Sequence, residues 1–71
     1  MILLIDGISH QINVSNKIYT SPDLKEFISI IEKREHKFTI DFDNTFNRPS
    51  KSFTTLQAAF REALLIQEDY K

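Results

Sequence analysis

The feature that most constrains the fold is an Asp6-Gly7 dipeptide between two short apolar runs near the start of the chain. It contains the only glycine among the 71 residues. A two-residue turn of type I′ needs a positive φ at both central positions, which Asp-Gly tolerates well. Segment 8–14, after the dipeptide, largely alternates apolar and polar residues. The sequence therefore predicts a β-hairpin with Asp6 and Gly7 at its turn.

This turn also predicts which side chains share a face of the hairpin. With Ile5 opposite Ile8, the face expected to enter the core carries Leu3, Ile5, Ile8, His10, Ile12 and Val14. Ile2 and Leu4 fall on the opposite face, beside polar residues of segment 8–14. Two aliphatic side chains on a polar sheet face are candidates for contact with a partner or with a second copy of the chain.

A helix is predicted from Ser21 to about Arg34 or Glu35. Segment 21–23, Ser-Pro-Asp, combines an N-cap, a proline at the first helical position and an acid in the first turn. Apolar residues then recur at helical spacing, at Leu24, Phe27, Ile28 and Ile31. Segment 15–20 would connect the hairpin to this helix. His36 would follow the C-terminus of the helix.

The second half of the chain predicts a strand followed by a helix. Segment 37–43 alternates, with Phe38, Ile40 and Phe42 inward, and segment 51–53 is a candidate return strand. Thr54 and Gln57 match a capping box, so a helix is expected to begin there and reach toward Tyr70. Its predicted inner face consists of Leu56, Ala59, Phe60, Ala63, Leu64 and Gln67.

Together these segments predict one domain over residues 1–71 of the α+β class. It would have two layers, a mainly antiparallel sheet of three or four strands with two helices on one face, in the order ββαβ(β)α. A β-grasp fold is the alternative, because it also begins with a hairpin followed by a helix and a strand. The long second helix argues against a β-grasp, which would have strand in that position.

Composition excludes several classes of function. Nine Lys and Arg against ten Asp and Glu give a net charge of -1, so there is no general basic field for nucleic acid. The lack of cysteine excludes disulfides and cysteine-based zinc sites, and a single glycine excludes glycine-rich phosphate loops. The apolar run 1–5 is too short for a signal peptide or a membrane span, so we expect a cytoplasmic protein without membrane contact.

No catalytic constellation is evident. Asp41-Phe42-Asp43-Asn44-Thr45 resembles the Asp-x-Asp-x-Thr motif of haloacid-dehalogenase-like phosphatases, but that family needs a much longer doubly wound domain. The two histidines, His10 and His36, have no evident nucleophile and orienting group beside them. We therefore expect no enzyme activity, no metal and no cofactor.

The loop after the predicted strand has the composition of a binding site. Phe46, Arg48 and Lys51 place an aromatic side chain beside two cations, which is typical of protein hot spots and of single-stranded nucleic acid sites. The predicted partner-binding residues are therefore these three together with Ile2 and Leu4.

The favoured hypothesis is a small protein-binding module, such as an inhibitor, an antitoxin-like protein or an adaptor of the kind carried by phages and plasmids. Segments 55–59 and 63–64 are similar to the helix opening of HicB-type antitoxin domains, although segment 44–50 lacks the glycines that precede that helix. Another protein is the expected partner, with homodimerisation as an option. A small nucleic-acid-binding protein that uses loop 44–51 is the alternative.

Overall fold

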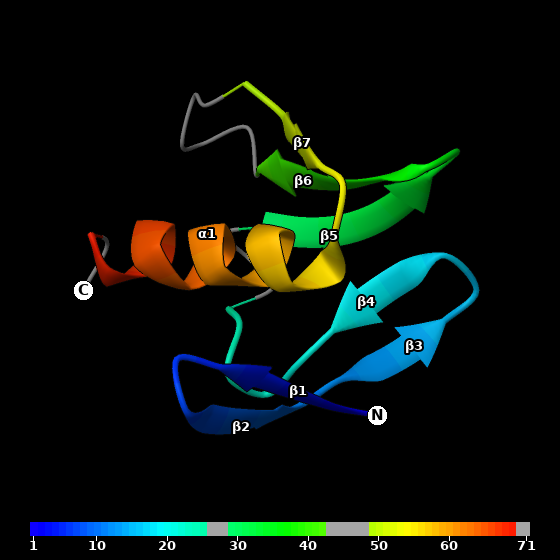
Figure 1. Ribbon diagram of the computed structural model, residues 1–71. Helices are drawn as coiled ribbons and strands as arrows, with labels where there is room; N and C mark the ends of the chain where they lie inside the picture. Colours follow the sequence, from blue (N-terminus) through cyan, green and yellow to red (C-terminus); the bar gives the residue numbers. More distant parts are fainter. Residues whose placement is uncertain (26–28, 43–48, 70–71) are drawn as a thin grey trace.

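The computed structural model describes residues 1–25, 29–42 and 49–69 of the chain. Within these residues the chain forms seven strands in two antiparallel sheets and one helix (Figure 1). The strands are β1 (Ile2–Ile5), β2 (Ile8–Gln11), β3 (Asn13–Ser15), β4 (Ile18–Thr20), β5 (Ser29–Arg34), β6 (Lys37–Phe42) and β7 (Lys51–Phe53), and the helix is α1 (Leu56–Glu68).

The predicted N-terminal hairpin is confirmed as the two-stranded sheet β1–β2. Ile5 pairs with Ile8 across a two-residue turn, and Asp6 and Gly7 both have positive φ, 50° and 81°. The ladder continues beyond the strands, because the Ile12 amide donates to the Met1 carbonyl at 2.8 Å. The hairpin is therefore held by backbone hydrogen bonds along its whole length.

The inward face of the hairpin is shorter than predicted. Ile5, His10 and Ile12 are buried, but Ile8 and Val14 are exposed. Ile8 lies beside the turn of the hairpin, and Val14 belongs to β3 of the other sheet.

Substituting Gly7 with valine is expected to lower the melting temperature. A left-handed conformation costs an ordinary L-residue about 1–2 kcal/mol, and a β-branched residue is a particular outlier there. A Cβ at Gly7 would meet no other atom within 4 Å, so the expected loss is due to the backbone alone. Each kcal/mol corresponds to about 4–8 °C in a domain of this size. Thermal melts of Gly7→Val and of the control Gly7→Asn, which tolerates positive φ, would check this; equal midpoints for the two variants would contradict it.

Strands β3 to β7 form a five-stranded antiparallel meander in sequence order. Only Ile12 separates β2 from β3, so the chain passes there from one sheet to the other. The predicted connector 15–20 is in fact the end of β3, the turn and the second strand of a hairpin, with Asn16 at φ 60°. The β5–β6 hairpin has Glu35 at φ 56°, so His36 lies in a strand-to-strand turn and does not follow a helix.

The helix predicted from Ser21 is wrong over its described part. The Ser21 hydroxyl accepts from the Asp23 amide at 3.2 Å, and the Leu24 amide donates to the Ser21 carbonyl at 3.1 Å. This is a turn, which Ser-Pro-Asp favours for the same local reasons that make it a helix start. Segment 29–34 is strand β5, paired on both sides, while Phe27 and Ile28 lie outside the described residues.

The predicted fold class is therefore wrong. The described chain is mostly sheet with one C-terminal helix, not a sheet of three or four strands under two helices. The β-grasp alternative also fails, because strand β5 occupies the region where that fold needs its helix. Strand β6 and the short return strand β7 were predicted correctly.

Helix α1 lies where it was predicted, but its N-cap is not the predicted residue. Thr55, not Thr54, is the N-cap, and its hydroxyl accepts from the Ala58 amide at 3.2 Å. Gln57 does not close a capping box but reaches across to donate to the Leu4 carbonyl at 3.3 Å. This contact joins the first turn of the helix to the N-terminal hairpin.

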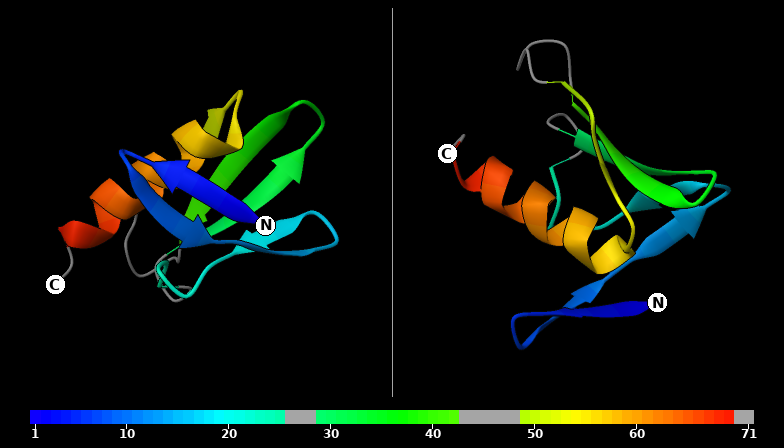
Figure 2. Two further views of the ribbon diagram at one scale, coloured as in Figure 1. Left: turned by 60° about the horizontal axis from the view of Figure 1, so that its bottom comes forward. Right: turned by 45° about the horizontal axis from the view of Figure 1, so that its top comes forward.

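The core lies where α1 packs against the meander on one side and the hairpin on the other (Figures 1 and 2). Ala59, Phe60 and Ala63 of the predicted helix face are buried, and so is Ile66, which was not predicted. The buried hydrophobic residues are Ile5, Ile12, Leu24, Ile31, Ile40, Ala59, Phe60, Ala63 and Ile66. Both sheets therefore pack against the same helix.

Candidate functional site

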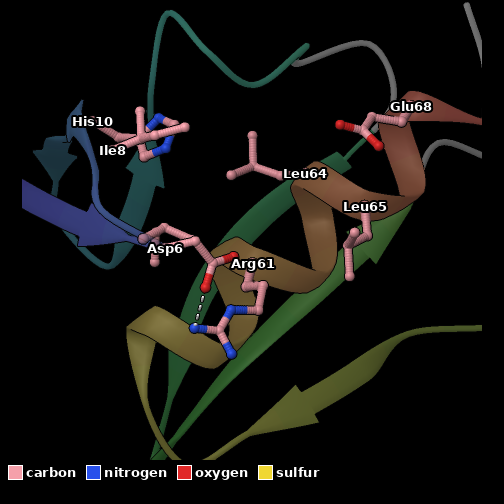
Figure 3. A pocket seen from close by; sticks show the side chains of 8 residues that line it. Asp6, Ile8, His10, Arg61, Leu64, Leu65 and Glu68 are labelled. Atoms are coloured by element: carbon pink, nitrogen blue, oxygen red, sulfur yellow. Dashed lines mark ion pairs between the residues drawn. The ribbon is translucent and has the colours of Figure 1, made fainter.

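A pocket of about 240 Å³ lies between the N-terminal hairpin and α1 (Figure 3). We call it the hairpin–helix groove. Its lining comes from the turn end of β1–β2 and from one side of the second half of α1, and consists of Ile5, Asp6, Ile8, His10, Arg61, Leu64, Leu65 and Glu68. The groove therefore lies at the junction of the hairpin and α1.

The middle of the groove is apolar. Ile8 is 62% exposed and Leu65 is 55% exposed, although both are large aliphatic residues. Leu64 beside them is half-buried, and Ile5 is fully buried beneath. Aliphatic side chains gathered from two elements around a concave site are typical of surfaces that bind a partner or ligand.

The two ends of the groove differ in charge. At one end the Arg61 guanidinium pairs with the Asp6 carboxylate at 3.0 Å. At the other end Glu68 has no cationic partner among the described residues, and α1 has no basic residue in its last turn. The carbonyl end of a helix carries a partial negative charge, which adds to that of Glu68. Among the described residues, the end of the groove at Glu68 is therefore electronegative.

His10 is a structural residue at the base of the groove. Its Nδ1 lies 2.7 Å from Asp23 Oδ2, and its ring centroid lies 5.1 Å from that of Phe60. The bond to Asp23 leaves only Nε2 to contact a ligand. Gln67 fixes the same turn, because its side chain donates to the Asp23 carbonyl at 2.7 Å and accepts from the Lys25 amide at 3.0 Å.

A second apolar surface lies on the outer face of the hairpin. Ile2 and Leu4 are 63% and 56% exposed, as expected for the face opposite the core. Their neighbours on β2, Ser9 and Gln11, are also exposed and uncharged. We call these four residues the outer hairpin face. Together with the groove, it places exposed aliphatic side chains on both faces of one hairpin.

Of the three residues predicted for the loop site, only Lys51 belongs to the described part of the chain. Phe46 and Arg48 lie outside the described residues. Lys51 lies on β7, and its Nζ pairs with Glu62 Oε2 on α1 at 2.6 Å. The Lys51 cation therefore already has a carboxylate partner.

The face of the meander away from α1 carries an ion cluster. The Arg34 guanidinium donates to Glu32 and to Asp41, each at 2.7 Å, and Ser50 donates to Asp41 at 2.8 Å. The hydrogen bond to Glu32, followed by the charge of Asp41, raises the pKa of Arg34 above its usual value. Asp41 of the phosphatase-like motif is thus an ion-pair partner on a solvated sheet face, while Asp43 lies outside the described residues.

Sequence reasoning missed the groove because it assigned each residue to a face one element at a time. Leu65 was available as a signal, since it is a leucine outside the predicted inner face of the helix. Ile8 was assigned to the core from the turn register and the alternation of segment 8–14. Their proximity depends on the packing of the hairpin against α1.

Comparisons with models of protein families, with curated proteins and with solved structures found no match. Within the described residues, no helix has the length and apolar character needed to cross a membrane. Nor do three or more potential metal-ligating side chains come together in that part of the chain.

Proposed function

We propose that this chain is a non-catalytic protein-binding module whose N-terminal hairpin presents the contact surface. The observation that carries the proposal is the exposure of Ile2 and Leu4 on one hairpin face, with Ile8 on the other. Exposed aliphatic side chains on a rigid, hydrogen-bonded scaffold lose water-contacting surface when a partner covers them, which favours association. An inhibitor or an adaptor is a module of this type.

Nucleic acid is the less favoured partner. Lys51, one of the cations of the predicted loop site, is paired with Glu62, and Arg34 is paired with two carboxylates. Binding to a phosphate backbone depends on cations that are available to replace counterions. Affinity for a nucleic acid would fall steeply between low and moderate salt, whereas a contact through aliphatic side chains would not.

Homodimerisation through the outer hairpin face is the form of binding we consider first. Two-fold contacts are self-complementary, so each residue meets the same surface on the other copy. A face of two aliphatic and two uncharged polar residues brings no like charges together in such a contact. The same face would also suit an apolar patch on another protein.

Substituting Ile2 and Leu4 together with lysine is expected to weaken binding strongly while the domain stays folded. Two cations at the centre of an apolar contact would be desolvated without partners, so a loss of at least tenfold in affinity is expected. The measurements are light scattering at high protein concentration and capture of proteins from the native host. The double variant Val14→Lys with Ile30→Lys is the matched control, because it adds the same charge at two other exposed aliphatic positions.

Two results would contradict the proposal. One is a wild-type protein that is monomeric at high concentration and captures no protein from its host. The other is equal loss of binding in the control variant, which would assign the effect to net charge and not to the outer hairpin face.

A further inference from the structure

We propose that the hairpin–helix groove binds an extended segment of a partner protein through an aliphatic side chain and a lysine or arginine two residues away from it. This inference rests on the proposed function and identifies the chemistry of a ligand at a second surface of the same hairpin. It concerns the groove alone and leaves the role of the outer hairpin face unchanged.

The size of the groove fits a large aliphatic side chain. An apolar cavity of about 150 Å³ already accommodates benzene, and the groove measures about 240 Å³. A leucine or isoleucine entering it would contact Ile8 from the hairpin and Leu64 and Leu65 from α1 (Figure 3). These contacts would cover the exposed surfaces of Ile8 and Leu65 at once, which removes both from water.

The charges at the two ends of the groove favour a basic residue near that aliphatic side chain in the bound segment. Arg61 is already paired with Asp6, so the groove has no free cation at that end to attract an acidic segment. Glu68 and the C-terminal carbonyls of α1 are both negative, and no described basic residue compensates them in the last turn. A lysine or arginine of the partner would therefore gain a carboxylate partner and a favourable helix-dipole interaction.

The spacing follows from helix geometry. Leu65 and Glu68 are three residues apart on α1, so their Cβ atoms are about 5–6 Å apart. In an extended segment, side chains on the same face are two residues and roughly 6.6 Å apart. An aliphatic residue over Leu65 therefore places the side chain two positions away beside Glu68. Since this spacing fits either direction of the segment, the expected motif is aliphatic-x-Lys/Arg or the reverse, Lys/Arg-x-aliphatic.

A random peptide library displayed on phage, selected on the immobilised full chain, tests this motif. Selected sequences are expected to be enriched, relative to the unselected library, in an aliphatic and a basic residue two positions apart. The best synthetic peptide should shift the NMR amide signals of Ile8, Leu64, Leu65 and Glu68. The same peptide with glutamate in place of its basic residue should bind at least tenfold more weakly.

Two matched pairs of variants locate the binding. Ile8→Ser should weaken the peptide at least tenfold, whereas Ile2→Ser, at an equally exposed isoleucine on the outer hairpin face, should leave it unchanged. Glu68→Gln should weaken it several-fold, whereas Glu35→Gln, an exposed acid in the β5–β6 turn, should not. Amide spectra of each variant establish that it remains folded.

Several results would overturn the inference: no enriched motif, an acidic motif, or equal losses in Ile8→Ser and Ile2→Ser. These outcomes are distinguishable from failure of the proposed function. If the Ile2 and Leu4 lysine variant loses its partner while peptides ignore the groove, protein binding stands and only the groove is excluded.

Discussion

Substituting Phe60 with alanine is expected to destabilise the domain by about 3–5 kcal/mol, the usual range for a buried phenylalanine. Phe60 is 1% exposed and lies in α1 against the His10 ring, at the junction of helix and hairpin. A domain of 71 residues has a total stability of about 4–11 kcal/mol at 0.05–0.15 kcal/mol per residue. The variant is therefore expected to be partly or largely unfolded at 37 °C.

Urea unfolding followed by circular dichroism measures this loss. Leu65→Ala is the matched control, because it shortens a large side chain on the same helix at a position that is 55% exposed. The control should lose less than about 1 kcal/mol, since alanine has the highest helix propensity and little buried surface is removed. Similar losses in the two variants would mean that α1 does not pack through Phe60.

Substituting Ile31 with alanine is expected to cost about 2–5 kcal/mol, whereas the same change at Ile30 should cost less than about 1.5 kcal/mol. The two isoleucines are adjacent in β5, and successive side chains of a strand point to opposite faces. Ile31 is fully buried opposite Ile40, while Ile30 is 41% exposed opposite Asp41. The two substitutions therefore differ in the burial of the side chain, while the residue type and the strand are the same.

The measurement is the free energy of unfolding of both variants under the same conditions. A larger loss for Ile30→Ala would reverse the faces of β5 and would contradict the observed pairing with β4 and β6. Comparable large losses would indicate that the outer face of the meander is also covered, for example by a second copy. Gel filtration at two protein concentrations would distinguish such self-association from a different strand register.

The binding residues differ in how much of their role could be read from the chain. The register set by the Asp6-Gly7 turn predicted that Ile2 and Leu4 lie away from the core, and their exposure agrees with that placement. Lys51 was predicted as a partner-binding cation from the composition of its loop, and its Nζ pairs with Glu62, 11 residues away on α1. Sequence neighbours do not show such a pair, because it forms only when β7 and α1 pack together.

Local signals by themselves determined the hairpin at Asp6-Gly7, strand β6 and helix α1. In each of these segments the turn chemistry or the side-chain period admits one backbone conformation, so no distant contact is needed to choose. Segment 21–34 was different, because Ser-Pro-Asp begins either a turn or a helix and its isoleucines fit either period. Only the tertiary structure decided it: β4 and β6 hydrogen-bond to both edges of β5 and bury Ile31, which a helix in that place would not allow. The groove, likewise, exists only because hairpin and helix meet.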